Sequence, residues 1–337
     1  MENSLNSNFS RNLSLSRPLI AVDWGTTSLR AAFITNEQVV EERSSEQGIM
    51  SVPPGEFPSV LSQICAKWLD NEDVLILISG MAGSAQGWQL APYCPCPVTP
   101  KQLAHQLHWI NPNKIAIVPG LSIRLEHAPD VIRGEEVQVI GALSLLGNQN
   151  ARLVLPGTHS KWVDVKEGRF ESFSTFMTGE FFSILREHSI LSKTLPSLLE
   201  ETEFDEAAFN EGLELSLASQ KSKTSKTSDL KSSGKVKTTY KPNLLHDVFG
   251  IRTLALFEEQ TAAQLLNKLS GLLIGYELQT QQFKKKEEVI IVGAPALQRC
   301  YSHALSSRGV KAIALGSEAT WRGFQVIAKE LEKITQN

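Results

Sequence analysis

One pattern of apolar strands and small-residue turns occurs twice in the chain. At residues 19–43 the run LIAV ends at Asp23 and is followed by a Gly-Thr-Thr turn and two strand-like stretches separated by Asn-Glu. At residues 153–176 the run LVL is followed by Pro-Gly-Thr-His-Ser and two strand-like stretches separated by Glu-Gly. Both units read strand, Gly-Thr turn, strand, tight turn, strand. Such a repeat indicates duplicated lobes that face one another, with two unrelated three-stranded meanders as the alternative.

The length of the chain agrees with two lobes. Its 337 residues are too many for one compact core and suit two lobes of roughly 150 residues each. We expect a disordered polar extension at 1–18, a first lobe at 19–148 that binds substrate and phosphate, and a second lobe at 149–337 that binds nucleotide. The stretch 218–243 holds seven lysines and almost no apolar residues, so it is predicted to be a flexible insertion.

Short apolar runs alternate with amphipathic stretches through the rest of the chain. Strands are predicted at 74–78, 115–118, 288–292 and 310–315. Helices are predicted at 61–69, 134–146, 180–190, 205–217, 258–279, 294–306 and 317–332, the last capped by Ser317. Two similar halves of mixed strands and helices predict an α/β fold: duplicated actin-like (ribonuclease H-like) ATPase lobes with an interlobe cleft.

Bulk properties disfavour several classes of protein. The net charge of -3 gives no reason to expect nucleic-acid binding, and no run of about 18 apolar residues predicts a membrane span. Cys94 and Cys96 are separated by one residue, a spacing that suits neither a zinc site nor a disulfide framework. A cytoplasmic protein is therefore expected. A transit peptide and a homodimer are left open.

The first turn has the chemistry of a phosphate-binding site. Gly25 allows the backbone to approach a nucleotide closely, and Thr26 and Thr27 offer N–H and hydroxyl donors to phosphate oxygens. Asp23, at the end of the strand, is a hard carboxylate that suits Mg²⁺. We predict that this turn binds the phosphates of ATP, with Asp23 as the metal ligand. An ordinary strand followed by a glycine turn is the alternative.

The second turn and a later strand are predicted to complete the nucleotide site. Gly157, Thr158, Ser160 and Lys161 are placed on the phosphates from the opposite lobe. The run IIVGAP places Gly293 and Ala294 after a buried strand and before a helix, where adenosine packs in this architecture. Neither a Walker A motif nor the spacing G-x-G-x-x-G follows the first strand, which disfavours P-loop and Rossmann sites.

A cluster of charged residues indicates a substrate site. The segment VIRGEE contains Arg133, which suits an anionic substrate, and Glu135, which suits the orientation or deprotonation of a hydroxyl. Glu136 and Glu180, the latter in Thr-Gly-Glu, are further substrate candidates. Carboxylates in the first turn of a helix also interact favourably with its dipole, so capping is the structural alternative.

A glycine-rich segment after the strand at 74–78 is the last candidate. The sequence SGMAGSAQGW places Gly83 where backbone can approach a ligand, and Trp88 can offer its indole as a platform for a sugar. A simple connecting loop is the alternative interpretation.

These stretches together resemble one family, the 2-dehydro-3-deoxygalactonokinases. The resemblance rests on AVDWGTTSLRA, GMAGSAQGW, the Val-Pro-Gly at 118–120, VIRGEEVQVIGA, LPGTHSKWV, TFMTGE and LSGLLIGYE, in this order over residues 20 to 277. It implies the hexokinase and actin architecture, with ATP and Mg²⁺ between the lobes. The insertion at 218–243 departs from the family pattern, and so does the lack of a second glycine directly after Gly293.

The resemblance also implies a reaction. The γ-phosphate of ATP would pass to the 6-hydroxyl of 2-dehydro-3-deoxy-D-galactonate, and the product would feed aldol cleavage in D-galactonate breakdown. Glu135 is the first candidate for orienting the hydroxyl, Asp23 is the second, and Arg133 would pair with the substrate carboxylate. A kinase for another sugar, sugar acid or polyol and a non-catalytic actin-like ATP-binding regulator are the alternatives.

Overall fold

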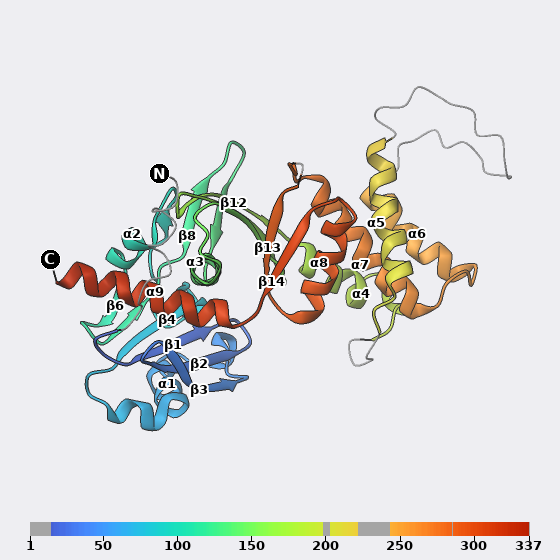
Figure 1. Cartoon of the computed structure of the whole chain (residues 1–337). Coiled ribbons are helices and arrows are strands. Elements are labelled where there is room, and N and C mark those ends of the chain that lie inside the picture. The colour runs from blue at the N-terminus through green and yellow to red at the C-terminus, as the bar shows by residue number, and fades with distance from the viewer. Residues whose placement is uncertain (1–14, 198–202, 222–242, 285, 337) are drawn as a thin grey trace, which may run out of the picture.

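The computed structural model describes residues 15–197, 203–221, 243–284 and 286–336, which form two sheet-based lobes and a helical outer part (Figure 1). Most of the predicted N-terminal extension and of the predicted insertion lies outside the described residues. Residues 15–18 are part of the fold, because the Ser16 amide donates to Glu332 Oε1 at 2.6 Å and Arg17 Nη1 donates to the Asn113 carbonyl at 2.8 Å.

The first lobe is built on a six-stranded sheet with the order β3-β2-β1-β4-β7-β6. Its strands are β1 (Leu19–Trp24), β2 (Leu29–Thr35), β3 (Gln38–Ser45), β4 (Leu75–Gly80), β6 (His108–Asn111) and β7 (Ile115–Ile117). The first three strands form an antiparallel meander, and β1, β4 and β7 run parallel. The predicted strand pattern of this lobe is therefore confirmed, with β6 as an addition.

The second lobe repeats this arrangement in a five-stranded sheet, β12-β11-β10-β13-β14. Its strands are β10 (Ala151–Leu155), β11 (Ser160–Lys166), β12 (Arg169–Phe176), β13 (Glu288–Val292) and β14 (Lys311–Leu315). The meander is again antiparallel, and β10, β13 and β14 are parallel. Two sheets with the same order and the same directions make this a duplicated, actin-like α/β fold, as the repeat predicted.

The pleat of β1 directs alternate side chains to two separate cores. Leu19 and Ala21 belong to the cluster shared with the interlobe helices, whereas Ile20, Val22 and Trp24 pack on the opposite face against α1 (Phe57–Cys65). Because both faces of the sheet are covered, the strand is apolar from Leu19 to Val22. The predicted helix at 61–69 is shifted: α1 ends at Cys65 and a 3₁₀ turn, Ala66–Asp70, follows it.

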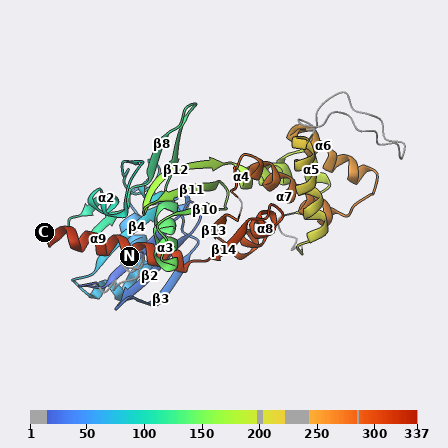
Figure 2. The same cartoon turned by 45° about the horizontal axis from the view of Figure 1, so that its top comes forward.

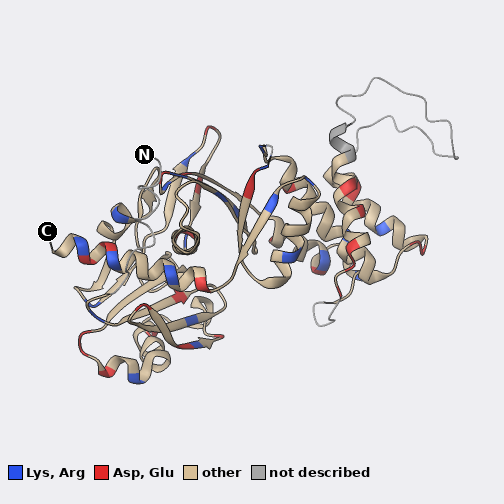
Figure 3. Ribbon diagram, in the orientation of Figure 1, with Lys and Arg blue, Asp and Glu red and all other residues tan. Residues whose placement is uncertain are grey.

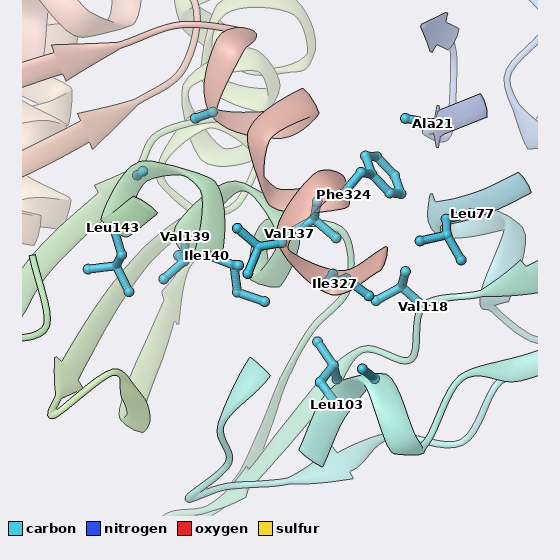
Figure 4. Close-up of a cluster of buried hydrophobic side chains, with 14 of the residues drawn as sticks. Ala21, Leu77, Leu103, Val118, Val137, Val139, Ile140, Leu143, Phe324 and Ile327 are labelled. Carbon is cyan, nitrogen blue, oxygen red and sulfur yellow. The ribbon is translucent and has the colours of Figure 1, made fainter. Parts of the chain in front are cut away.

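Two helices connect the lobes. Helix α3 (Glu135–Leu146) packs against α9 (Glu318–Thr335), and Figure 4 shows Phe324 and Ile327 of α9 among Val137, Val139 and Ile140 of α3 and side chains of the first sheet. The contact is so close that a Cβ added at Gly141 would lie 1.7 Å from the Ala319 carbonyl oxygen. Although α9 follows the second sheet in the sequence, it therefore packs on the first lobe.

The outer part of the second lobe is helical and lies far from the first sheet (Figures 1 and 2). It contains α4 (Thr178–His188), a 3₁₀ turn (Ile190–Lys193), α5 (Glu206–Lys221), α6 (Leu244–Leu256), α7 (Ala262–Gln279) and α8 (Pro295–Ser306). Three expectations are corrected. Helix α6 was not predicted; α7 begins at a capping box on Thr261 instead of at Glu258; and Ser317 makes no side-chain capping bond to α9.

A small sheet and several short elements complete the first lobe. The sheet contains β5 (Cys94–Pro95), β8 (Leu121–Arg124) and β9 (Pro129–Ile132). The short elements are α2 (Pro100–His105) and 3₁₀ turns at Ile49–Ser51 and Met81–Gly83. Acidic and basic side chains are interspersed along α9 (Figure 3), where Lys329 pairs with Glu332. Among the described residues, no helix is long and apolar enough to cross a membrane.

Candidate active site

A cleft of about 1360 Å³ lies between the lobes and is lined by both copies of the repeat. Ten of the predicted site residues contribute to its lining: Asp23, Gly25, Thr26, Arg133, Glu135, Gly157, Thr158, Lys161, Gly293 and Ala294. Six others lie outside the lining that the described residues form: Thr27, Gly83, Trp88, Glu136, Ser160 and Glu180. The fold thus brings residues more than 250 positions apart to one cavity.

The first Gly-Thr turn is held from behind by a neighbouring loop. The Ile49 amide donates to the Gly25 carbonyl at 3.0 Å, and the Met50 amide donates to the Thr26 carbonyl at 3.2 Å. Gly48 makes this contact possible, since a Cβ there would lie 2.3 Å from the Thr26 carbonyl oxygen. The Gly25 amide is bonded within the turn, to the Ser28 carbonyl at 2.9 Å, and Gly25 and Thr26 line the cleft. Sequence reasoning missed Gly48, for which an isolated glycine was the only local signal.

Asp23 lines the cleft beside this turn. Its Oδ2 atom accepts a hydrogen bond from Arg30 Nη2 at 2.5 Å, across the antiparallel pair β1–β2. The described residues contain no group of three or more His, Cys, Asp or Glu side chains that could hold a metal by themselves. A Mg²⁺ ion bound through one carboxylate, phosphate oxygens and water does not need such a group.

The second turn differs from the first by one residue. Asp23 pairs with Arg30 across six residues (24–29), whereas Leu155 pairs with Lys161 across five (156–160). Ser160 is therefore the counterpart of the buried Leu29, and a shift of one residue turns a strand side chain to the other face. Ser160 is fully buried and its Oγ donates to Glu277 Oε1 at 2.9 Å. We correct its predicted phosphate contact to this internal bond.

The first turn of α4 supports the second Gly-Thr turn from below. The Glu180 amide donates to the Thr158 carbonyl at 2.8 Å, and a Cβ at Gly179 would lie 2.2 Å from the Gly157 carbonyl oxygen. The Glu180 carboxylate lies 2.5 Å from His159 Nε2. The Glu180 side chain therefore contacts the turn that lines the cleft, and its predicted contact with substrate stays a prediction.

Arg133 is a nearly buried guanidinium in the lining of the cleft. Arg133 is 9% exposed. Its Nη2 atom donates to the Ala91 carbonyl at 2.8 Å, and its guanidinium carbon lies 4.3 Å from the centre of the Tyr93 ring. The Nε and Nη1 atoms have no hydrogen-bond partner among the described residues. A buried, charged donor without an acceptor is unfavourable, so this site is suited to an anion.

Gly83 and Trp88, the candidates from the glycine-rich segment, both have structural roles. A Cβ at Gly83 would lie 2.7 Å from Arg133 Nη1, so the glycine leaves room for the guanidinium. The Trp88 ring stacks on Phe57 with centroids 6.3 Å apart, as part of the core behind β1. Neither residue lines the cleft, and the substrate contact expected of each stays a prediction.

Glu135 and Lys161 form an ion pair between the lobes. Glu135 begins α3 and Lys161 lies on β11, and their side chains approach to 2.6 Å between Oε1 and Nζ. The second carboxylate oxygen, Oε2, accepts the Arg133 amide at 3.0 Å. Both side chains are largely shielded, with 20% and 12% exposure. A carboxylate and an ammonium group thus lie together at the edge of the cleft.

Glu136 is turned away from the cleft and is fully buried. Its carboxyl accepts the Gly134 amide at 2.7 Å and the Ser79 hydroxyl at 3.2 Å. Gly134 has a φ of 108°, which a residue with a side chain rarely adopts, and this turn aims Glu135 at the cleft. Burial, together with the neighbouring Glu135, raises the pKa of Glu136 to about 8. The predicted substrate contact of Glu136 is therefore replaced by a role in the turn.

The far end of the cleft is formed by the loop between β13 and α8. Gly293 and Ala294 line it together with the ends of β14 and α9. Gln298 fixes the loop, because its Nε2 atom donates to the carbonyls of Gly293 and Leu315 at 2.8 Å each. The lining residues Tyr93, Thr175 and Gln298 were missed, since no sequence motif places them beside the predicted ones.

Comparison with known proteins agrees with this architecture. The family model described as 2-keto-3-deoxy-galactonokinase matches residues 23–236 and 221–327. The chain is 30% identical to the 2-dehydro-3-deoxygalactonokinase of Escherichia coli K12 over 92% of its own length and 97% of the relative. It is 34% identical to a candidate 2-dehydro-3-deoxygalactonokinase of Rhizobium meliloti 1021, over 92% and 96% of the two chains.

A solved structure extends the comparison to the fold. The crystal structure of a candidate 2-dehydro-3-deoxygalactonokinase from Sinorhizobium meliloti superposes with a TM-score of 0.78 at 33% sequence identity. It covers 92% of this chain and 98% of the relative. Family model, sequence relatives and structure agree, so the chain belongs to the 2-keto-3-deoxy-galactonokinase family.

Proposed function

We propose that this chain transfers the γ-phosphoryl group of ATP to the 6-hydroxyl of 2-dehydro-3-deoxy-D-galactonate. The observation that carries the proposal is a single cleft that combines two Gly-Thr turns with a buried arginine whose Nε and Nη1 atoms are unpartnered among the described residues. Membership of a kinase family implies ATP as the donor, and the name of the Escherichia coli relative supports the acceptor.

The nucleotide would lie between the lobes. Gly25 and Thr26 would bind phosphate from the first lobe, Gly157 and Thr158 from the second, and the loop at Gly293 would receive the adenosine. Asp23 would hold Mg²⁺, which neutralises the charge that develops on the phosphates when it is bound. The pair of Asp23 with Arg30 supports this assignment, because it keeps a carboxylate fixed at the cleft next to the turn.

Arg133 is suited to the carboxylate of the acceptor. A guanidinium has five N–H donors in one plane, and in Arg133 the Nη2 donor is bonded to a backbone carbonyl while Nε and Nη1 lack acceptors among the described residues. A substrate carboxylate would supply them in a charge-assisted bond. A neutral sugar or a polyol would leave them unpaired, which disfavours the neutral acceptors among the alternative substrates.

Glu135 is proposed to orient the attacking hydroxyl. Its position next to Arg133 in the chain places the carboxylate near the anion site, and Lys161 holds it from the opposite lobe. Asp23 is the second candidate, but it is already bonded to Arg30. Binding of ATP would offer Lys161 a phosphate in place of Glu135, so that the carboxylate is released toward the hydroxyl.

The test is a substrate panel with the full chain, MgATP and coupled detection of ADP. We expect ADP release with 2-dehydro-3-deoxy-D-galactonate, a lower kcat/KM with its C4 epimer, and none with neutral sugars or polyols. In R133M the KM for the acid should rise by about 100-fold or more, with the KM for ATP nearly unchanged. Turnover of a neutral sugar that equals or exceeds turnover of the acid would refute the substrate assignment.

A further inference from the structure

The buried carboxylate of Glu277 accepts hydrogen bonds from elements that form the nucleotide half of the cleft. It ends the segment LSGLLIGYE on α7, and its residue is 4% exposed. Gly271 and Gly275 on the same helix contact α5. A Cβ at Gly271 would lie 2.0 Å from the Phe209 carbonyl oxygen, and a Cβ at Gly275 would lie 2.2 Å from Ser216 Oγ. At about 100° per residue, Glu277 projects roughly 200° away from Gly275, toward the second sheet.

Four uncharged donors converge on this carboxylate. Glu277 Oε1 accepts from Ser160 Oγ at 2.9 Å and from Trp162 Nε1 at 2.7 Å. Oε2 accepts from the Tyr301 hydroxyl at 2.9 Å and from Thr178 Oγ1. Burial raises the pKa of Glu277, while these four hydrogen bonds oppose the rise. The donors satisfy the acceptor capacity of a carboxylate that no solvent reaches.

The donors belong to three elements that shape the nucleotide half of the cleft. Ser160 begins β11 directly after the Gly157–Thr158 turn, and Thr178 begins α4, whose next two residues support that turn. Tyr301 lies on α8, whose N-terminal loop at Gly293 forms the proposed adenosine end. One side chain therefore joins the proposed phosphate and adenosine ends.

We propose that Glu277 is the positioning residue of the nucleotide site, which fixes the second Gly-Thr turn, the start of α4 and helix α8 relative to one another. It does not line the cleft, so it acts through these elements and not by contact with ATP. The inference depends on the proposed function only in requiring that the cleft binds a nucleoside di- or triphosphate. Displacement of the turn by about 1 Å is sufficient to weaken binding and transfer strongly.

Two variants separate positioning from general stability. E277L keeps the approximate volume and removes every acceptor. E277Q keeps one oxygen for Ser160 and Trp162, and its amide can donate to the hydroxyls of Thr178 and Tyr301, which also accept. We expect the ADP Kd and the ATP KM of E277L to rise about tenfold or more, and those of E277Q to stay within about threefold of wild type. The KM for the sugar acid should change by less than about twofold in both.

The assays are calorimetric titration of the full chain with MgADP, steady-state kinetics, and denaturant unfolding to confirm the folded fraction. A purely structural role would lower the apparent kcat and leave both KM values and the ADP Kd of the folded fraction unchanged. A folded E277L protein with the wild-type ADP Kd overturns the proposal. If E277L does not accumulate as folded protein, S160A/Y301F removes two donors and is judged by the same Kd criterion.

The nucleotide titration also separates this inference from the substrate assignment. A wild-type protein that binds MgADP but does not phosphorylate the sugar acid refutes the proposed acceptor, and the variant Kd values then still decide the role of Glu277. A wild-type protein that binds no nucleotide refutes both.

Discussion

Glu136 should make the stability of this protein fall as the pH rises. The residue is fully buried, and its two described hydrogen-bond donors, the Gly134 amide and the Ser79 hydroxyl, are uncharged. Burial and the adjacent Glu135 raise its pKa from 4.5 to about 8. The folded state therefore holds a proton that the unfolded state has released, throughout the interval between these two values. In this interval each rise in pH favours the unfolded chain.

The size of the effect follows from the two pKa values. Stability from this group is fully present below pH 4.5 and is lost as the pH rises through about 8. Between pH 4.5 and 8.5 the loss in unfolding free energy from Glu136 alone is about 4 kcal/mol, with a slope of at most about 1.4 kcal/mol per pH unit. Glu136→Gln removes the titration, and its amide can still accept from Gly134 and donate to Ser79.

The assay is urea unfolding of wild type and E136Q across pH 4.5 to 8.5. The stability of E136Q relative to wild type should increase steadily by about 4 kcal/mol over this range, because all other titrating groups are shared. E135Q is the matched control on the same helical turn. The stability of E135Q/E136Q relative to E135Q should also increase with pH, but by a smaller amount. Parallel pH profiles for wild type and E136Q would refute the reasoning.

Four further outcomes are expected. The E135Q protein should lose most of its turnover but bind MgATP about threefold more tightly, because Lys161 no longer has to leave a carboxylate to bind phosphate. Weaker MgATP binding by calorimetry would contradict this. D23N should raise the Mg²⁺ concentration for half-maximal rate about tenfold or more, and an unchanged Mg²⁺ titration would remove Asp23 as ligand. G323A should lower the unfolding free energy by about 3 kcal/mol, since its Cβ would lie 1.9 Å from a backbone oxygen of α3. G250A, whose Cβ meets nothing within 4 Å in α6, should stabilise slightly in the same denaturation assay.

The repeated strand unit was predictable because its signal is local. Short apolar runs bounded by Gly-Thr and Asn-Glu or Glu-Gly turns depend on neighbours in the sequence, and β1 to β3 and β10 to β12 follow them closely. The packing of α9 on the first lobe could not be predicted in this way. It depends on Gly141 and Gly323, which lie 182 positions apart and allow two helix backbones to touch. No local pattern encodes that contact.

The site was predictable where residue type alone indicates chemistry. Arg133 and Glu135 line the cleft as expected of an anion-binding guanidinium and a hydroxyl-orienting carboxylate. Glu136 carries the same side chain one residue later, yet it is buried, since adjacent residues of a helix point about 100° apart. Composition identified the cluster correctly, but which member faces the ligand depends on the phase of the helix.

The two copies of the repeat differ chemically because different residues occupy the paired positions of their first two strands. Asp23 and Arg30 are a cross-strand pair in the first lobe, and Leu155 and Lys161 occupy the equivalent paired positions in the second. Leu155 offers no carboxylate at the position paired with Lys161, and Lys161 pairs across the cleft with Glu135 instead. The acid that we propose as the Mg²⁺ ligand thus lies in one lobe, and the cation that we propose to exchange its partner lies in the other. If the second hairpin also had an acid at the paired position, Lys161 would pair with that acid within its own lobe. Nucleotide binding could then not release the Glu135 carboxylate, which we expect to orient the acceptor.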